Sequence, residues 1–299
     1  MQNVRGIALV ILAMLFFTIE DGFNKYLTGD LPPGQVMVLL GVGGVVLFGG
    51  ICLVRGYPIF GADSRRPTVI FRTVSEGFAT LFFITSLALV PIATVAAVFQ
   101  AMPLAITLGA ALFLGEQVGW RRWSAVAVGF LGVLIVIRPG MAGFQVEALL
   151  VLGAVVAVAA RDLLSRRMPP ALPSTVAAFL AFGALMPAGG ILMLILGDSW
   201  VAMDGLQALL MLLSFLSMAA GYYFMLLATR IGDASAITPF RYTRLLFTLI
   251  MGALIFAEIP DALTYLGSAL ILGSGIYTFL RERRLARVNL AQARATPLP

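Results

Sequence analysis

Two arginines, Arg241 and Arg244, lie in an otherwise apolar stretch, TPFRYTRLLF, at residues 238–247. A charged side chain inside a membrane helix is costly and marks a functional site by default. If a helix spans 234–257, Arg244 lies about 15 Å from its start, near the middle of a bilayer and too deep to reach the interface easily. A guanidinium can bind a carboxylate or a phosphate through two parallel hydrogen bonds. The chemistry that these residues offer is therefore recognition of an anionic group.

Two roles are compatible with these arginines. Either they form ion pairs with Glu76 or Asp162 that latch helices together, or at least one of them faces a water-filled cavity and binds the substrate. We favour the second role, because the positions equivalent to them in the internal repeat described below are Phe99 and Met102. The fold itself therefore does not require arginine at this depth.

Other polar and aromatic side chains in apolar stretches complete a candidate cavity. Arg72 and Glu76 are four residues apart, so we expect them to pair on one face of a helix. Tyrosine, glutamine and asparagine are also common where helices pack together, and phenylalanine is common against lipid, so a structural role stays open for each. The residues predicted to line the cavity are Glu20, Asn24, Glu76, Phe78, Phe82, Gln100, Tyr223, Arg241, Tyr242 and Arg244.

Two further pairs with the same spacing lie near helix ends. Asp21 and Lys25, and Asp162 and Arg166, are each four residues apart and are expected to maintain the fold as ion pairs. Two prolines, Pro103 and Pro239, lie inside predicted helices, where each removes one backbone hydrogen bond. Such breaks persist at membrane depth where protein or a wet cavity satisfies the freed carbonyl. We predict that they are hinges, with a plain kink as the alternative.

The search for catalytic residues is negative. The sequence has no histidine, one cysteine (Cys52), no glycine-rich phosphate loop with lysine and no G-x-S-x-G motif. We therefore predict no catalytic residue, no metal site and no cofactor. An integral membrane enzyme is the alternative from a different class, and the lack of histidine weakens it. A structural or assembly protein is a third class, but it would not require charges near the membrane midplane.

The elements that must position these residues are membrane helices. Hydrophobic residues make up 61% of the 299 residues and charged residues 11%, far from the balance of a soluble domain. Residues 77–115 contain no charge and are too long for one span, so the chain must turn near Pro91. Ten helices are predicted, at 5–27, 33–54, 68–89, 92–114, 122–138, 144–164, 174–196, 205–229, 234–257 and 261–280.

The distribution of basic residues supports ten helices with both ends in the cytoplasm. With a cytoplasmic N-terminus, the inside segments hold nearly all the loop arginines and the outside segments hold only Lys25 and Arg138. The basic residues lie in short loops and at the C-terminus without interleaved aromatic residues, so nucleic acid is not an expected partner.

An internal repeat divides the ten helices into two halves. The segment LFLGEQVGWRRW (112–123) resembles LIFAEIPDALTY (254–265), with Glu116 and Glu258 in equivalent places. Both glutamates are expected to cap helix ends. Because five helices form each copy, the second must enter the membrane from the other side, as in many secondary transporters. We predict a first repeat at 1–141, a second at 142–285 and a disordered cytoplasmic tail at 286–299.

These features resemble the ten-helix, EamA-type branch of the drug/metabolite transporter superfamily, and within it the YddG-like amino-acid exporters. The resemblance is carried by the small residue and glutamate that end the fourth and ninth helices, by Ala88 and Ala228, and by Arg72. It implies a central cavity lined by the first, third, fourth, sixth, eighth and ninth helices.

The predicted protein is thus a secondary transporter of the inner (plasma) membrane. It would export small metabolites, most of all amino acids, by alternating access. Another metabolite or drug class is the alternative within the superfamily. The expected partners are a small-molecule substrate and the lipid bilayer, and the sequence is compatible with a monomer.

Overall fold

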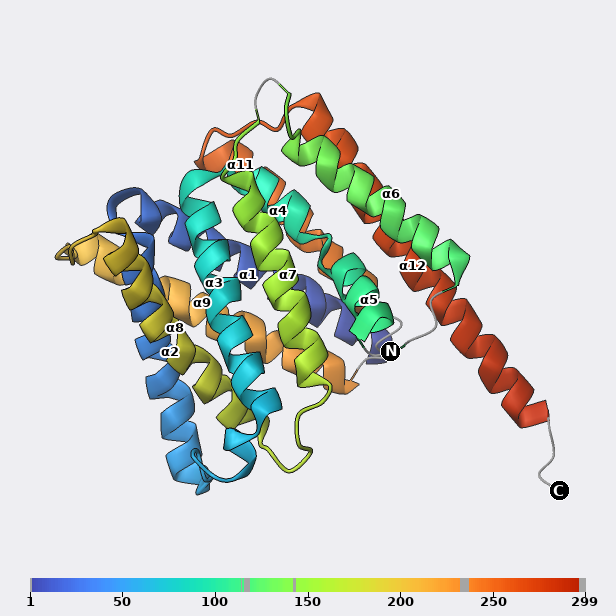
Figure 1. The fold of residues 1–299 in the computed structure, drawn as a ribbon, viewed down its shortest axis with the longest axis horizontal. Coiled ribbons are helices and arrows are strands. Elements are labelled where there is room, and N and C mark those ends of the chain that lie inside the picture. Colours follow the sequence, from blue (N-terminus) through green and yellow to red (C-terminus); the bar gives the residue numbers. More distant parts are fainter. Residues whose placement is uncertain (1, 114, 116–118, 142–143, 232–236, 296–299) are drawn as a thin grey trace.

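The computed structural model of the chain describes residues 2–113, 115, 119–141, 144–231 and 237–295. These residues form helices joined by short loops, with no strand among them (Figure 1). The predicted all-helical class is therefore confirmed. In chain order the elements are α1 (Gln2–Asp30), α2 (Pro33–Arg55), η1 (Asp63–Arg65), α3 (Pro67–Leu89), α4 (Ile92–Phe99), α5 (Met102–Phe113), α6 (Trp120–Ile137), α7 (Ala148–Ser165), α8 (Ser174–Leu196), α9 (Gly205–Ile231), η2 (Thr238–Tyr242), α11 (Thr243–Ile255) and α12 (Ala262–Ala295).

The helices account for all ten predicted spans. Eight helical stretches are long and apolar enough to cross a membrane, with α4 and α5 counted together as Ile92–Phe113. The other two spans are α6, whose apolar part is Trp123–Ile137, and η2 followed by α11. Residues 232–236, at the start of the ninth predicted helix, lie outside the described residues. The turn predicted near Pro91 is confirmed, because α3 ends and α4 begins on either side of it.

The packing of the helices has the symmetry of an inverted repeat. Helix α1 packs against α9, α3 against α7, α2 against α8, α4 against α11, and α6 against α12. If the two halves are exchanged, the α1–α9 pair becomes the α7–α3 pair, and the other three pairs map onto themselves. Two five-helix repeats of opposite orientation therefore build the bundle, with both termini on the cytoplasmic side.

The last helix is longer than the sequence predicted. Helix α12 continues to Ala295 and runs past the end of α6 (Figure 1). Residues 286–295 are thus helical rather than part of a disordered tail, and 296–299 lie outside the described residues. The physical reason is composition: from Tyr277 to Ala295 the sequence has neither proline nor glycine and is rich in arginine, leucine and alanine, which favour helix.

Candidate functional site

A cavity of about 620 Å³ lies between the two repeats. It reaches Met168 and Ser174, beside the cytoplasmic loop between α7 and α8, so it opens toward the cytoplasm. The first, third, fourth, sixth, eighth and ninth predicted helices were expected to line it, and all six do. The seventh predicted helix, α8, lines it as well. The side chains used below are Phe17 (α1), Arg72, Glu76 and Phe83 (α3), Phe99 and Gln100 (α4 and its end), Arg161 and Asp162 (α7), Tyr222 and Met225 (α9), Arg241 (η2) and Arg244 (α11).

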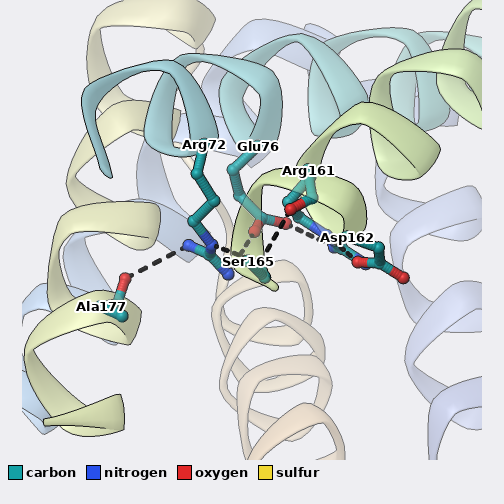
Figure 2. A network of polar contacts seen from close by, with 6 residues as sticks. All are labelled: Arg72, Glu76, Arg161, Asp162, Ser165 and Ala177. Carbon is teal, nitrogen blue, oxygen red and sulfur yellow. Dashed lines mark hydrogen bonds and ion pairs between the residues drawn. The ribbon is translucent and has the colours of Figure 1, made fainter. Parts of the chain in front are cut away.

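A network of ion pairs forms the wall of the cavity near its mouth. Glu76 accepts from Arg72 at 3.1 Å and from Arg161 at 2.8 Å, and Arg161 also contacts the Asp162 carboxylate at 2.8 Å (Figure 2). Arg72 further donates to the Ser165 hydroxyl at 3.3 Å, and it also reaches a backbone carbonyl of α8. The predicted pairing of Arg72 with Glu76 is confirmed. Each of these guanidinium groups is held by a carboxylate, so the network ties α3 to α7 and α8.

Arg244 is held by a carboxylate that the sequence analysis paired differently. Its Nε and Nη2 donate to Asp21 of α1 at distances between 2.7 and 3.1 Å. Its guanidinium also lies 5.6 Å from the ring centroid of Phe17 and about 6 Å from those of Phe83 and Phe99. The sequence analysis expected Asp21 to pair with Lys25, but Asp21 pairs with Arg244 instead. The carboxylate that holds Arg244 is therefore neither Glu76 nor Asp162. Arg244 thus joins α1 to α11 at the deep end of the cavity, away from its cytoplasmic mouth.

Arg241 differs from the other cavity arginines. It projects from η2 into the cavity, and its closest polar contact is the thioether sulfur of Met225, at 3.5 Å from Nη2. Among the described residues no carboxylate lies within ion-pair distance of it. Asp162 lines the same cavity and is close enough to act on Arg241 electrostatically. A thioether is a weak acceptor, so the Arg241 guanidinium stays available to an anionic group.

The proline breaks lie where the cavity ends. Helix α4 stops at Phe99 and α5 begins at Met102, one residue before Pro103. Pro239 lies in the tight helical turn η2, two residues before Arg241. Gln100 sits in the α4–α5 break, and its buried Nε2 has no acceptor among the described residues. It borders both the main cavity and a small adjoining space of about 10 Å³, the room for about one water.

The outer side of the bundle is closed by a second cluster. Lys25 forms an ion pair with Glu258 at 3.0 Å and donates to the backbone carbonyls of Leu87 and Val90 at 3.3 and 3.0 Å. The same glutamate accepts the Ile92 N–H at 2.7 Å, at the first residue of α4. The capping role predicted for Glu258 is therefore confirmed, across helices. Glu116, its counterpart, lies outside the described residues.

An outer vestibule of about 310 Å³ ends on this cluster and includes Glu258 in its wall. At its rim Arg138 donates to Asp261, and the Thr264 N–H donates to the same carboxylate at 2.9 Å. These hydrogen bonds, with that of Arg138 the larger contribution, lower the pKa of Asp261 from its ordinary value of 3.8 to about 2.

Several predicted site residues lie elsewhere. Phe78 and Phe82 stack on each other outside the cavity lining, and Phe78 is 52% exposed on the outer surface of the bundle. Tyr223 is also exposed beyond the lining, whereas its neighbour Tyr222 is part of it. The reason is helix geometry, because adjacent residues point about 100° apart. These three side chains are therefore not part of the cavity lining in this structure.

Three polar residues predicted for the cavity lie outside its lining. The Asn24 side chain accepts from the Ser214 hydroxyl at 2.7 Å, which joins α1 to α9. The Tyr242 hydroxyl lies against Gly275 of α12, where a Cβ atom would come within 2.0 Å of it. Glu20 lies on α1 beside Asp21 and is not part of the lining. Of the predicted cavity residues, Glu76, Gln100, Arg241 and Arg244 do line it.

The site has the character of a binding cavity. Among the described residues no group of three or more histidine, cysteine or acidic side chains is placed to hold a metal ion. What the cavity offers is paired charges, aromatic walls and one exposed guanidinium.

The comparisons with known proteins agree with this architecture. The model of the EamA-like transporter family matches residues 4–138 and 145–280, one match for each repeat. An S-adenosylmethionine uptake transporter of Rickettsia prowazekii (strain Madrid E) is 25% identical over 94% of both chains. A riboflavin transporter of Rhizobium johnstonii is 33% identical over 72% of this chain and 71% of its own. The pseudopaline exporter CntI of Pseudomonas aeruginosa is 25% identical over 89% of this chain and 93% of its own.

These relatives are named as transporters, in agreement with the prediction that the chain is a multi-pass membrane transporter and not an enzyme. The amino-acid specificity predicted from the sequence is not among their named functions. With two family matches that coincide with two inverted helical repeats, the chain belongs to the EamA-like transporter family, in the drug/metabolite transporter superfamily, and is a membrane transporter.

Proposed function

We propose that this transporter moves a small solute of the amino-acid class, and that Arg241 binds its carboxylate. The observation that carries the proposal is the charge balance of the cavity. The carboxylates of Glu76, Asp162 and Asp21 hold the other three arginines, which leaves Arg241 as the cation without a counter-ion among the described residues. A substrate anion would supply that counter-ion through a charge-assisted pair.

Asp162 supports an amino acid over a simple anion. One of its oxygens contacts Arg161, its side chain is 34% exposed, and it lines the same cavity as Arg241. An ammonium group on the substrate would face this carboxylate while the substrate carboxylate faces Arg241. S-adenosylmethionine, named for the rickettsial relative, carries such an α-amino-acid end.

The transport cycle proposed is alternating access between the repeats. The cavity opens toward the cytoplasm, and the pair of Lys25 and Glu258 closes the outer side. Parting this pair while the helices around the cytoplasmic mouth come together would expose the same site to the outer vestibule. Export, with loading from the cytoplasm, stays the predicted direction.

The test is flux into proteoliposomes with a panel of amino acids, S-adenosylmethionine and riboflavin. Arg241→Gln should raise the half-saturating concentration by roughly tenfold to more than a hundredfold, the cost of a lost charge-assisted hydrogen bond. Arg241→Lys should restore binding only in part, because it keeps the charge without the planar fork. The matched control is Arg55→Gln, an exposed arginine at the cytoplasmic end of α2.

Unchanged saturation in Arg241→Gln would refute the role of this residue. Transport of riboflavin with no flux of any solute that carries an α-amino acid would refute the substrate class.

A further inference from the structure

A groove of about 320 Å³ runs between α6 and α12, away from the central cavity. Its walls change character along the two helices. Trp120, Arg121 and Tyr277 lie near the cytoplasmic end, and Val128 and Gly273 lie deeper toward the membrane centre. Trp120 is 73% exposed, and both aromatic residues face outward from the bundle. The groove is therefore open to the lipid phase, polar at the level of the headgroups and apolar below.

Two guanidinium groups mark the polar end: Arg121 lines the groove, and Arg281 lies next to Gly119, just beyond the lining. Arg121 stacks on Trp120, with its Cζ 5.3 Å from the ring centroid, and stays exposed. Arg281 extends from α12 toward the start of α6, where its Nη2 would lie 3.6 Å from a Cβ atom on Gly119. Its Nη1 is buried and has no hydrogen-bond acceptor among the described residues. A buried donor without an acceptor is destabilising, so an anionic or polar ligand at this position would be favoured.

The surrounding sequence is strongly basic. Residues 119–124 and 277–287 together contain six arginines (121, 122, 281, 283, 284 and 287) and one acidic residue, Glu282. Clusters of this size directly cytoplasmic of a membrane helix attract anionic lipids. Helix α12 continues straight past the first residue of α6, so the arginines that follow Arg281 belong to the part of the helix that extends beyond the bundle (Figure 1).

We propose that this groove binds one anionic phospholipid of the inner leaflet. Its phosphate would lie between Arg121 and Arg281, and one acyl chain would follow the groove past Val128 and Gly273. The aromatic side chains of Trp120 and Tyr277 would flank the glycerol region, where such rings are favoured. The site is separate from the transport cavity, and the proposal does not depend on the transported substrate.

The depth of the groove allows the charged and apolar contacts to be tested separately. A Cβ atom added at Gly273 meets nothing within 4 Å, so Gly273→Leu would fill the acyl path without displacing protein atoms. Replacing both Arg121 and Arg281 by glutamine removes the headgroup contacts and leaves the groove open. The matched control replaces Arg55 and Arg65, two exposed arginines at the same membrane face, by glutamine.

The experiment is native mass spectrometry of the full chain in detergent, titrated with dioleoyl phosphatidylglycerol or with dioleoyl phosphatidylcholine. We expect a 1:1 adduct with phosphatidylglycerol that survives activation, and at least tenfold weaker retention of phosphatidylcholine. The double glutamine variant should weaken phosphatidylglycerol binding by roughly tenfold or more. Gly273→Leu should weaken it as well, and the Arg55 and Arg65 control should bind like the wild type.

Three results would overturn the proposal. Equal retention of both lipids, or equal loss in the control variant, would mean that general charge attraction explains binding. Full competition by inorganic phosphate at the same concentration would mean that the acyl path contributes nothing. If the double glutamine variant does not fold, wild-type retention in Gly273→Leu alone would still reject the groove as the lipid site.

Discussion

The pair of Asp21 and Arg244 gives a sharp test of which cavity arginine is structural. Arg244→Gln removes the cation from a carboxylate that is only 7% exposed and that receives three contacts from Arg244, of 2.7 to 3.1 Å. Removing one partner of a buried ion pair typically costs about 3–5 kcal/mol, since the remaining charge is left unpaired. At roughly 2–4 °C for each kcal/mol, the melting temperature should fall by on the order of 10 °C.

The assay is thermal unfolding of the purified protein in detergent, followed by intrinsic fluorescence. Asp21→Asn in the Arg244→Gln background should recover most of the loss, because no unpaired charge then remains. Arg241→Gln is the internal comparison and should melt within about 2 °C of the wild type, since it leaves no carboxylate without its partner. The reasoning would be refuted if Arg244→Gln melted normally, or if the double variant were no more stable than the single one.

Two other outcomes are expected. Parting the outer cluster by Lys25→Met should let an impermeant thiol reagent reach a cysteine placed at Leu87 from the outside, and reversing both charges of Lys25 and Glu258 should restore protection. Because the pKa of Asp261 is lowered to about 2, its stabilising contribution is present above about pH 4 and is lost as the pH falls toward 2. Asp261→Asn should remove that part of the pH dependence of the melting temperature, and an unchanged profile would show that the rim contact is not stabilising.

Much of the fold was predictable because membrane helices depend on local quantities. Span lengths, the charge-free stretch that turns near Pro91 and the alternation of arginines all follow from the thickness and asymmetry of the bilayer. The repeat was visible because the two glutamates and their flanking residues recur at a nearly constant offset. The extra length of α12 was missed because hydropathy marks the end of a span and says nothing of a helix that continues into water.

The candidate site was less predictable, for two physical reasons. Asp21 and Arg244 are 223 residues apart in the sequence, so only tertiary packing brings them together. From the sequence alone, Lys25, four residues after Asp21, was the evident partner. The face of α3 that lines the cavity could have been predicted. Arg72 and Glu76 lie on one face of the helix, and steps of four and then three residues lead from Glu76 to Phe83 on the same face. Phe78 and Phe82 do not continue that face. Their prediction as cavity residues rested only on their being aromatic.

The outer vestibule changes the energetics of the pair that closes it. Lys25 and Glu258 are only 13% and 23% exposed, so separating them inside lipid or a dry core would leave two charges without solvation. The vestibule, however, brings room for water to Glu258 itself and to Ala93 and Thr94, in the first turn of α4. As the ions part, hydration can replace each lost contact in turn, including the Ile92 N–H that the glutamate releases. Because water can replace its contacts one by one, the Lys25–Glu258 pair is suited to separate during transport, whereas the Asp21 carboxylate, only 7% exposed and held by three contacts from Arg244, is suited to stay paired.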